Sequence, residues 1–198
     1  MTAADDQAKR KEMVLDLVRR PPPRDVPPDL LRAARNPVAA FLIWVGIVGD
    51  AFVTILLVIA FAWLARTPET LQDQSVMMLV VLLYVAVSSP LSLMFVSGLR
   101  SRGMTQQILE NGVPVKTRIR AVSRIPFNLK GRAFSKLQLE VTTPDGRVVQ
   151  ATDVGDDAMA DFFLAARDEE RELDALFHPA YPTRAILLAR LAAVDRWD

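Results

Sequence analysis

The chain has 198 residues, with 24 lysines and arginines against 23 aspartates and glutamates, a single histidine and no cysteine. The lack of cysteine excludes disulfides, thiolate metal sites and cysteine nucleophiles, and the lone His178 argues against imidazole-based zinc or haem sites, so we expect no cofactor and no metal. The net charge of +1 provides no strong positive field, and nucleic acid is not an expected partner.

Residues 1–36 predict a cytoplasmic N-terminal arm of short helices and a Pro-rich spacer. The pattern of residues 4–20 is helical and ends before Pro21-Pro22-Pro23, and residues 29–35 allow two further helical turns before Pro37. The first helix either docks on a membrane surface or a partner, or belongs to a loosely ordered tail. The sequence does not choose between these alternatives, because a helix this short is marginal in water.

Two apolar runs, residues 38–65 and 76–96, follow the arm. Each has the roughly 20 apolar residues needed to cross about 30 Å of hydrocarbon, which predicts a two-helix transmembrane hairpin over residues 37–99. Trp44 and Trp63 are about 28 Å apart along the first helix, as expected for aromatic anchors at the two interfaces. Thr67-Pro68-Glu69-Thr70 lies in the short link between the helices.

The distribution of cations predicts the orientation of the hairpin. Lysines and arginines are frequent before the first run and after the second, whereas Arg66 is the cation of the link. By the positive-inside rule both termini are cytoplasmic, and we expect a multi-pass protein of the bacterial inner (cytoplasmic) membrane.

One carboxylate, Asp50, lies within the first apolar run. Equal counting from the link places it at the depth of Pro90, which leaves the carbonyl of Ala86 without its usual helical partner. We expect a polar contact inside the hairpin, made by Asp50, Thr54, Ser88, Ser89, Pro90 and Ser92. An intramembrane carboxylate is by default a functional site, but the hairpin offers no other carboxylate, lysine or histidine for a relay. We therefore favour a structural hydrogen bond that locks the hairpin or joins it to a neighbouring subunit.

Residues 100–198 predict a cytoplasmic α+β domain. The second helix continues to Asn111-Gly112, and Thr143-Pro144-Asp145-Gly146 is a strong turn. The residue patterns predict strands at 113–121, 134–141, 148–154, 173–177 and 184–188, and helices at 156–171 and 189–198. The fold class is therefore a membrane α-helical hairpin plus a small α+β domain, built as a curved antiparallel sheet or small barrel with one helix.

Two charged groups of this domain invite a functional interpretation. Lys116, Arg118 and Arg120 form the outer face of the first strand, and they either contact lipid headgroups or form a solvated strand face. The acidic run contains Asp168, Glu169, Glu170 and Glu172. Consecutive acids on a helix point in different directions, which favours a solvated face over a metal site. Trp197, near the C-terminus, is either a core side chain or an exposed contact.

The turns of this domain carry a resemblance to a known family. The motifs are Asn111-Gly112-Val113-Pro114-Val115, Pro144-Asp145-Gly146 and Phe177-His178-Pro179-Ala180-Tyr181-Pro182. Over residues 111–188 the chain resembles a widespread bacterial family of unknown function that couples membrane helices to a small OB- or SH3-like β-barrel. That family usually has Tyr-Asp-Pro-x-x-Pro in its last strands and a short Gly-Asp turn where this chain has an acidic helix. The resemblance implies a fold and no catalytic residues.

No nucleophile-base pair, phosphate loop or metal cluster is visible in the sequence, and we do not expect an enzyme. The expected function is that of a non-catalytic accessory or structural subunit of a larger membrane complex, with a respiratory or photosynthetic complex as a candidate. Its expected partners are other membrane protein subunits and the lipid bilayer. Two alternatives stay open: a membrane-anchored regulatory module that binds a peptide, lipid headgroup or small ligand, and ion or proton conduction through Asp50 in an oligomer.

Overall fold

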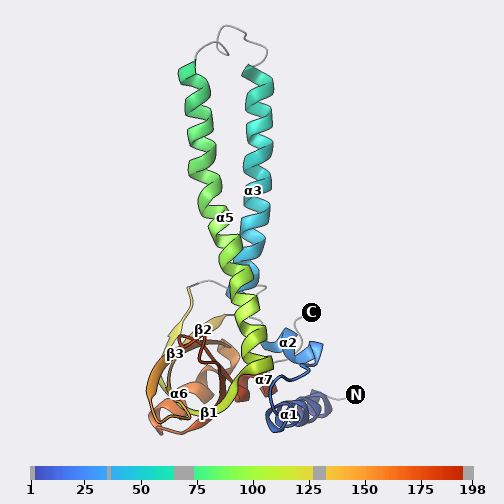
Figure 1. Cartoon of the computed structure of the whole chain (residues 1–198), viewed down its shortest axis with the longest axis vertical. Helices are drawn as coiled ribbons and strands as arrows, with labels where there is room; N and C mark the ends of the chain where they lie inside the picture. Colours follow the sequence, from blue (N-terminus) through green and yellow to red (C-terminus); the bar gives the residue numbers. More distant parts are fainter. Residues whose placement is uncertain (1–2, 35–36, 65–73, 127–132, 194–198) are drawn as a thin grey trace. The chain divides into compact units, whose positions relative to one another are not determined.

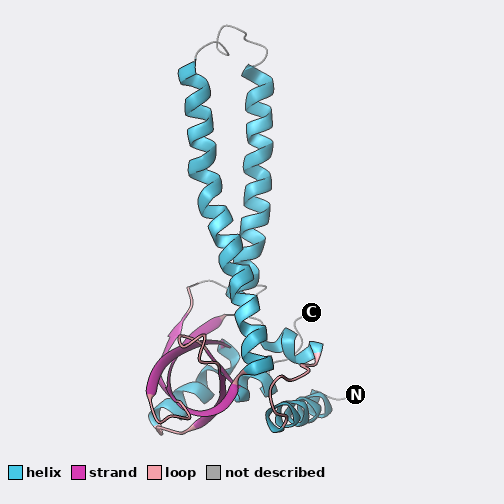
Figure 2. Cartoon of the chain, viewed as in Figure 1, coloured by secondary structure: helices cyan, strands magenta, loops and turns pink. Residues whose placement is uncertain are grey.

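The structure is a computed structural model that describes residues 3–34, 37–64, 74–126 and 133–193. The chain divides into two compact units, which we call the barrel unit (Met1–Asn36 with Gly103–Asp198) and the hairpin unit (Pro37–Arg102). The described residues form six α-helices, a short 3-10 helix and five strands (Figures 1 and 2). The predicted link at residues 67–70, part of the loop near residue 130 and Trp197 lie outside the described residues.

The two apolar runs of the sequence form helices, as predicted. Helix α3 covers Pro37–Leu64 and helix α5 covers Gln74–Asn111, with Pro90 inside α5. Both helices are long and apolar enough to cross a membrane by length and composition. The boundary between the two units falls inside α5, because its residues from Gly103 onward belong to the barrel unit.

The five strands form one antiparallel sheet with the order β3-β2-β1-β4-β5. The strands are β1 (Val113–Arg124), β2 (Phe134–Thr142), β3 (Val148–Asp156), β4 (Leu173–Phe177) and β5 (Ala185–Leu187). A parallel bridge between Thr152 and Arg184 joins the two edge strands, and the Thr152 amide donates to the Thr183 carbonyl at 2.9 Å. A register shift between Ile119 and Ala121 bends β1. The sheet is therefore a nearly closed barrel (Figure 2).

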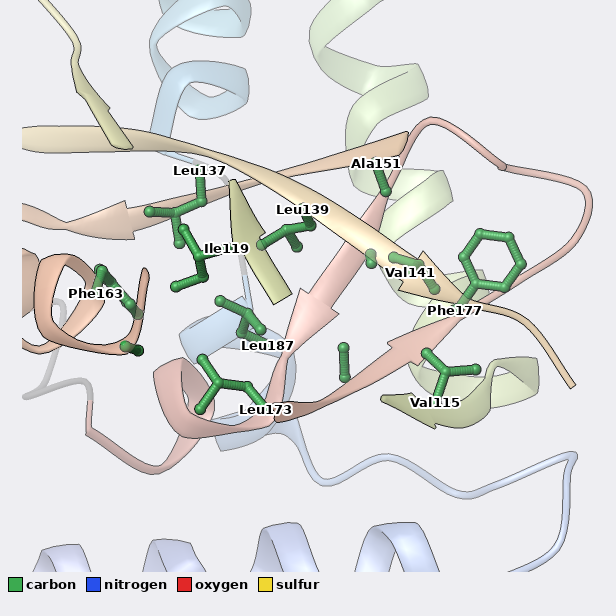
Figure 3. Close-up of a cluster of buried hydrophobic side chains, with 13 residues drawn as sticks. Val115, Ile119, Leu137, Leu139, Val141, Ala151, Phe163, Leu173, Phe177 and Leu187 are labelled. Atoms are coloured by element: carbon green, nitrogen blue, oxygen red, sulfur yellow. The ribbon is translucent and has the colours of Figure 1, made fainter. Parts of the chain in front are cut away.

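The inside of this barrel is filled by alternating side chains of the strands, as the period-two pattern predicted. Leu137, Leu139 and Leu187 are buried and point toward one another (Figure 3). Phe163 of helix α6 (Ala160–Asp168) completes this core. The predicted helix at 156–171 is shorter in the structure at both ends. Asp156 caps a separate 3-10 turn (η1, Asp157–Met159) that precedes α6, and α6 ends at Asp168, so Glu170 and Glu172 of the acidic run lie beyond the helix.

A second core joins the N-terminal arm to the rest of the barrel unit. Helices α1 (Ala3–Arg19) and α2 (Pro28–Ala34) contribute the buried Val14, Leu17 and Leu30. These side chains pack against the end of α5, strands β4 and β5, and helix α7 (Leu188–Ala193), through Ile108, Leu109, Leu176, Ile186 and Leu191. In Figure 1 the arm lies beside α7. The arm thus packs on its own chain, an arrangement that neither alternative from the sequence included.

The Pro-rich spacer of the arm is fixed at the C-terminal end of α5. The amide of Arg24 donates to the carbonyl of Glu110 at 2.9 Å, and its guanidinium donates to the carbonyl of Gly112 at 2.6 Å. A cation at a helix C-terminus satisfies free carbonyls and opposes the negative end of the helix dipole. Arg24 is buried at this position, and the burial lowers the pKa of its guanidinium.

Candidate functional site

Three glycines mark the closest approach of α3 and α5 within the hairpin unit. A Cβ added to Gly46 would lie 2.7 Å from the Cβ of Phe95, and one added to Gly98 would lie 2.6 Å from Cγ1 of Ile43. At Gly49 the nearest atom, Cδ2 of Leu91, would be 2.8 Å away. Glycine has no side chain, and this allows the two helix backbones to pack closely at these three positions.

This packing gives the depth of the predicted polar contact. Gly49 lies opposite Leu91, so Asp50 lies at the level of Pro90, as counting from the link predicted. Asp50 is half-buried, and the Thr54 hydroxyl donates to the backbone carbonyl of Asp50 at 2.9 Å. Within the described part of the chain the Asp50 carboxyl has no hydrogen bond or ion pair. Its contact with the serines therefore stays a prediction.

The other predicted hairpin residues differ in exposure. Ser88 is half-buried, whereas Ser89, Pro90 and Ser92 are exposed on α5. Trp44 and Trp63 are 70% and 65% exposed, respectively. Exposed tryptophans are compatible with anchoring at membrane interfaces, which stays a prediction.

The basic face of β1 is paired with carboxylates in the structure. Lys116 lies 2.7 Å from Asp174, Arg118 lies 2.8 Å from Glu172, and Arg120 lies 2.5 Å from Glu140 on the neighbouring strand β2. These pairs cancel the uncompensated positive charge on which attraction to anionic headgroups depends. Contact with headgroups stays a prediction, and the local charge balance favours the solvated strand face.

The Arg120–Glu140 pair predicts a pH effect. The hydrogen bond from Arg120 lowers the pKa of the Glu140 carboxyl below 4.5, its usual value. Because the folded state holds this proton more weakly than the unfolded state, the pair stabilises the fold above that usual pKa. The contribution is lost as the pH falls through the lower pKa of the folded state. We expect NMR titration of Glu140 to give a higher pKa in Arg120→Gln than in the wild type, with Lys136→Gln as an exposed control on β2; equal pKa values would contradict this.

The acidic run and His178 have local structural partners. Asp168 pairs with Arg167, Glu169 with Arg171, and Glu172 with Arg118. Among the described residues no group of three or more histidines and acids has an arrangement that could hold a metal ion. Nδ1 of His178 accepts a hydrogen bond from the amide of Ala180 at 3.1 Å. His178 is therefore held as a turn residue.

The sequence prediction missed a buried ion pair at the seam of the barrel. Asp153 of β3 and Arg190 of α7 form this pair, and both side chains are only 4% exposed. The other carboxyl oxygen of Asp153 accepts the amide of Leu187 on β5 at 3.0 Å. Asp153 thus joins the two edge strands next to the backbone bridge at Thr152. Arg184, close by, is desolvated, and this burial lowers the pKa of its guanidinium.

The same ion pair reaches the N-terminal arm. The second terminal nitrogen of Arg190 donates to the carbonyl of Ala34 at 2.9 Å, at the C-terminal end of α2. One buried guanidinium therefore connects β3, α7 and α2. A signal was present in the sequence, because Asp153 takes an inward position of its strand between Ala151 and Gly155, where a carboxylate needs a buried partner.

Comparison of the chain with models of known protein families, with curated proteins and with solved structures gave no match.

Proposed function

We propose that this protein is a non-catalytic accessory subunit of a larger membrane protein complex, anchored by α3 and α5. The observation that carries the proposal is the extent of apolar surface that these helices leave exposed. Ile55, Leu79 and Leu93 are 58%, 65% and 70% exposed, and Phe52, Val58, Ile59, Met78, Leu82, Leu83 and Val96 are similarly uncovered. A surface of this size is stable only against lipid or against other apolar helices.

The charge distribution supports the placement of the anchor. Lysines and arginines are frequent before α3 and in the residues from Arg100 onward. This distribution favours both termini in the cytoplasm of a bacterial cell. The barrel unit would then present the ion-paired outer face of β1 and the N-terminal helical arm to cytoplasmic surfaces of other subunits. Such a role requires contact surfaces and no reacting groups.

A second candidate, a regulatory binding module, is favoured by the connectivity of the barrel. Strands β1, β2 and β3 form a meander, α6 connects β3 to β4, and β5 returns to meet β3 in parallel at Thr152. This connectivity is that of an OB-like barrel, a fold that often binds ligands on a strand face. Under this alternative the barrel would bind a peptide, lipid headgroup or small ligand by itself.

Extraction from native membranes separates the two candidates. The tagged chain would be extracted in mild detergent, sized, and its companions identified, with an unrelated two-helix membrane protein at matched expression as the control. We expect recovery in fixed ratio with a large complex that the control protein does not retain. Recovery as a discrete small species would contradict the accessory-subunit proposal and favour the binding module.

A further inference from the structure

The seam between the edge strands β3 and β5 is the shortest strand junction in the described part of the barrel. Strand β5 has three residues, whereas β2 and β3 pair along the whole length of both strands. At the seam the structure shows one isolated bridge, between Thr152 and Arg184, and the amide of Leu187 donates to the carboxyl of Asp153 at 3.0 Å. Backbone pairing therefore contributes little to the closure of the barrel, which depends on the contacts that surround β5.

The N-terminal arm covers the outer side of β5. Ala185 and Leu187 of this strand belong to the core inside the barrel. Ile186, between them, belongs to the second core, together with Leu17 and Leu30 of the arm. Each of these five side chains is at most 4% exposed. The short strand is thus held between two cores, and the arm supplies one of them.

The buried guanidinium of Arg190 joins the seam to the arm. One of its nitrogens pairs with Asp153 on β3, and another donates to the carbonyl of Ala34 at 2.9 Å. Ala34 is the last residue of α2, where a helix leaves carbonyls without intrahelical partners. The same guanidinium therefore satisfies the end of the arm and the carboxylate that binds the Leu187 amide. Withdrawal of the arm would remove both the Ala34 acceptor and the packing against Ile186 from this junction.

We propose that the N-terminal arm is a strap that controls the closure of the barrel. The arm and the seam open together in one step, while β1, β2 and β3 stay paired. Because such coupling is reciprocal, a partner that holds the arm away from the barrel would open the seam, and a ligand that binds only the closed barrel would keep the arm docked. Opening would expose N–H and C=O groups on the edges of β3 and β5, the groups through which a sheet adds a further strand.

Hydrogen exchange of the full chain in detergent tests this step. The amides of Thr152 and Leu187 are hydrogen-bonded across the seam, so each exchanges only when the seam opens. In the wild type we expect both amides and the slowest amides of α1 to have the same protection from exchange, because one step exposes them all. The amides between β2 and β3 should be protected more strongly, since their pairing survives this step.

Two matched valine variants perturb the arm and the strand pairing separately. Val14 of α1 is 5% exposed in the second core, and Val141 of β2 is 0% exposed in the barrel core. Val14→Ala destabilises the docked arm, so the amides of α1, Thr152 and Leu187 should all exchange about tenfold faster. Val141→Ala weakens the closed and the open barrel equally. It should accelerate exchange between β2 and β3 and leave the amides of the seam and of α1 at their wild-type rates.

Each other outcome would overturn the proposal. Unequal protection of α1 and of the seam in the wild type would mean that the two open separately. Unchanged exchange of Thr152 and Leu187 in Val14→Ala would mean that the seam opens with the arm still docked. If Val141→Ala accelerated the seam as much as the amides between β2 and β3, the seam would open only when the whole barrel unfolds.

Discussion

The variant Arg190→Ala is expected to lose about 3–5 kcal/mol of the free energy of unfolding of the barrel unit. Removing the guanidinium takes the paired cation from the buried Asp153 carboxylate, leaves only Arg184 as a neighbouring cation among the described residues, and frees the Ala34 carbonyl at the end of α2. A buried charge without a partner costs far more than the net contribution of the intact pair. The loss should therefore be large although the intact ion pair is itself only weakly stabilising.

Two control variants isolate this effect. Arg118→Ala removes one partner of the exposed pair with Glu172, and we expect it to cost less than about 1 kcal/mol. The double variant Asp153→Leu with Arg190→Leu removes both buried charges. Its loss of unfolding free energy should be smaller than the sum of the losses in the single variants Asp153→Leu and Arg190→Leu. Hydrogen exchange at the slowest amides of β1 and β2, in the full chain in detergent, measures the free energy of unfolding.

The ion pair also predicts where the loss appears first. Because Arg190 bonds to α2 and Asp153 accepts the amide of Leu187, exchange should accelerate in α2, β5 and α7 before it does so in β1 and β2. A uniform change across all strands, or a loss no larger than that of Arg118→Ala, would show that the pair does not hold the seam and the arm together.

The local elements of this fold were predictable because each has a periodic pattern or a specific turn. Leu137, Leu139 and Val141 alternate with polar residues, and this pattern predicted both the strand β2 and its buried face. The turn at residues 143–146 was predictable from its residue types, because Gly146 has the positive φ of 78° that glycine readily adopts. Among the described residues, strand and helix boundaries agree with the predictions to within a few residues except at the helix predicted over 156–171.

The packing of the arm was not predictable, because it depends on contacts between residues far apart in the chain. Leu17 and Leu30 are too few to distinguish a docked arm from a loose tail by pattern alone. Their partners, among them Leu176 and Leu191, come from the last strands and helix.

The sequence showed the basic residues of β1 as one face, but it did not show that Asp174, Glu172 and Glu140 would lie opposite them. Pairing across a sheet depends on register, which single-sequence patterns do not determine.

The end of α5 shows a correct prediction with a different physical cause. The helix ends at Asn111 as expected, and a following glycine usually takes the left-handed conformation. Among the described glycines, however, positive φ occurs at Gly146 and not at Gly112. Gly112 is required for space, because a Cβ there would lie 2.2 Å from the carbonyl oxygen of Ile108 and 3.2 Å from that of Phe177.

This geometry predicts a severe effect of Gly112→Ala, at least about 2 kcal/mol of the free energy of unfolding of the barrel unit. The methyl group would meet backbone oxygen atoms, which cannot rotate away as a flexible side chain can. The backbone must shift, and the shift would disturb the hydrogen bond from Arg24 to the Gly112 carbonyl and the pairing of Val113 with Phe177. The Pro-rich spacer, the start of β1 and the end of β4 would all lose contacts.

Gly103→Ala is the control, since it makes the same change inside α5, at a position where an added Cβ meets nothing within 4 Å. There alanine should be neutral or stabilise the helix by about 0.5–1 kcal/mol, because glycine is the poorer helix former. Thermal unfolding of both variants, followed by circular dichroism, and hydrogen exchange at β1 and β4 would compare them directly. If Gly112→Ala were as stable as Gly103→Ala, the contact between Gly112 and Ile108 would not limit the packing, and α5 would end at Asn111 for reasons of local conformation alone.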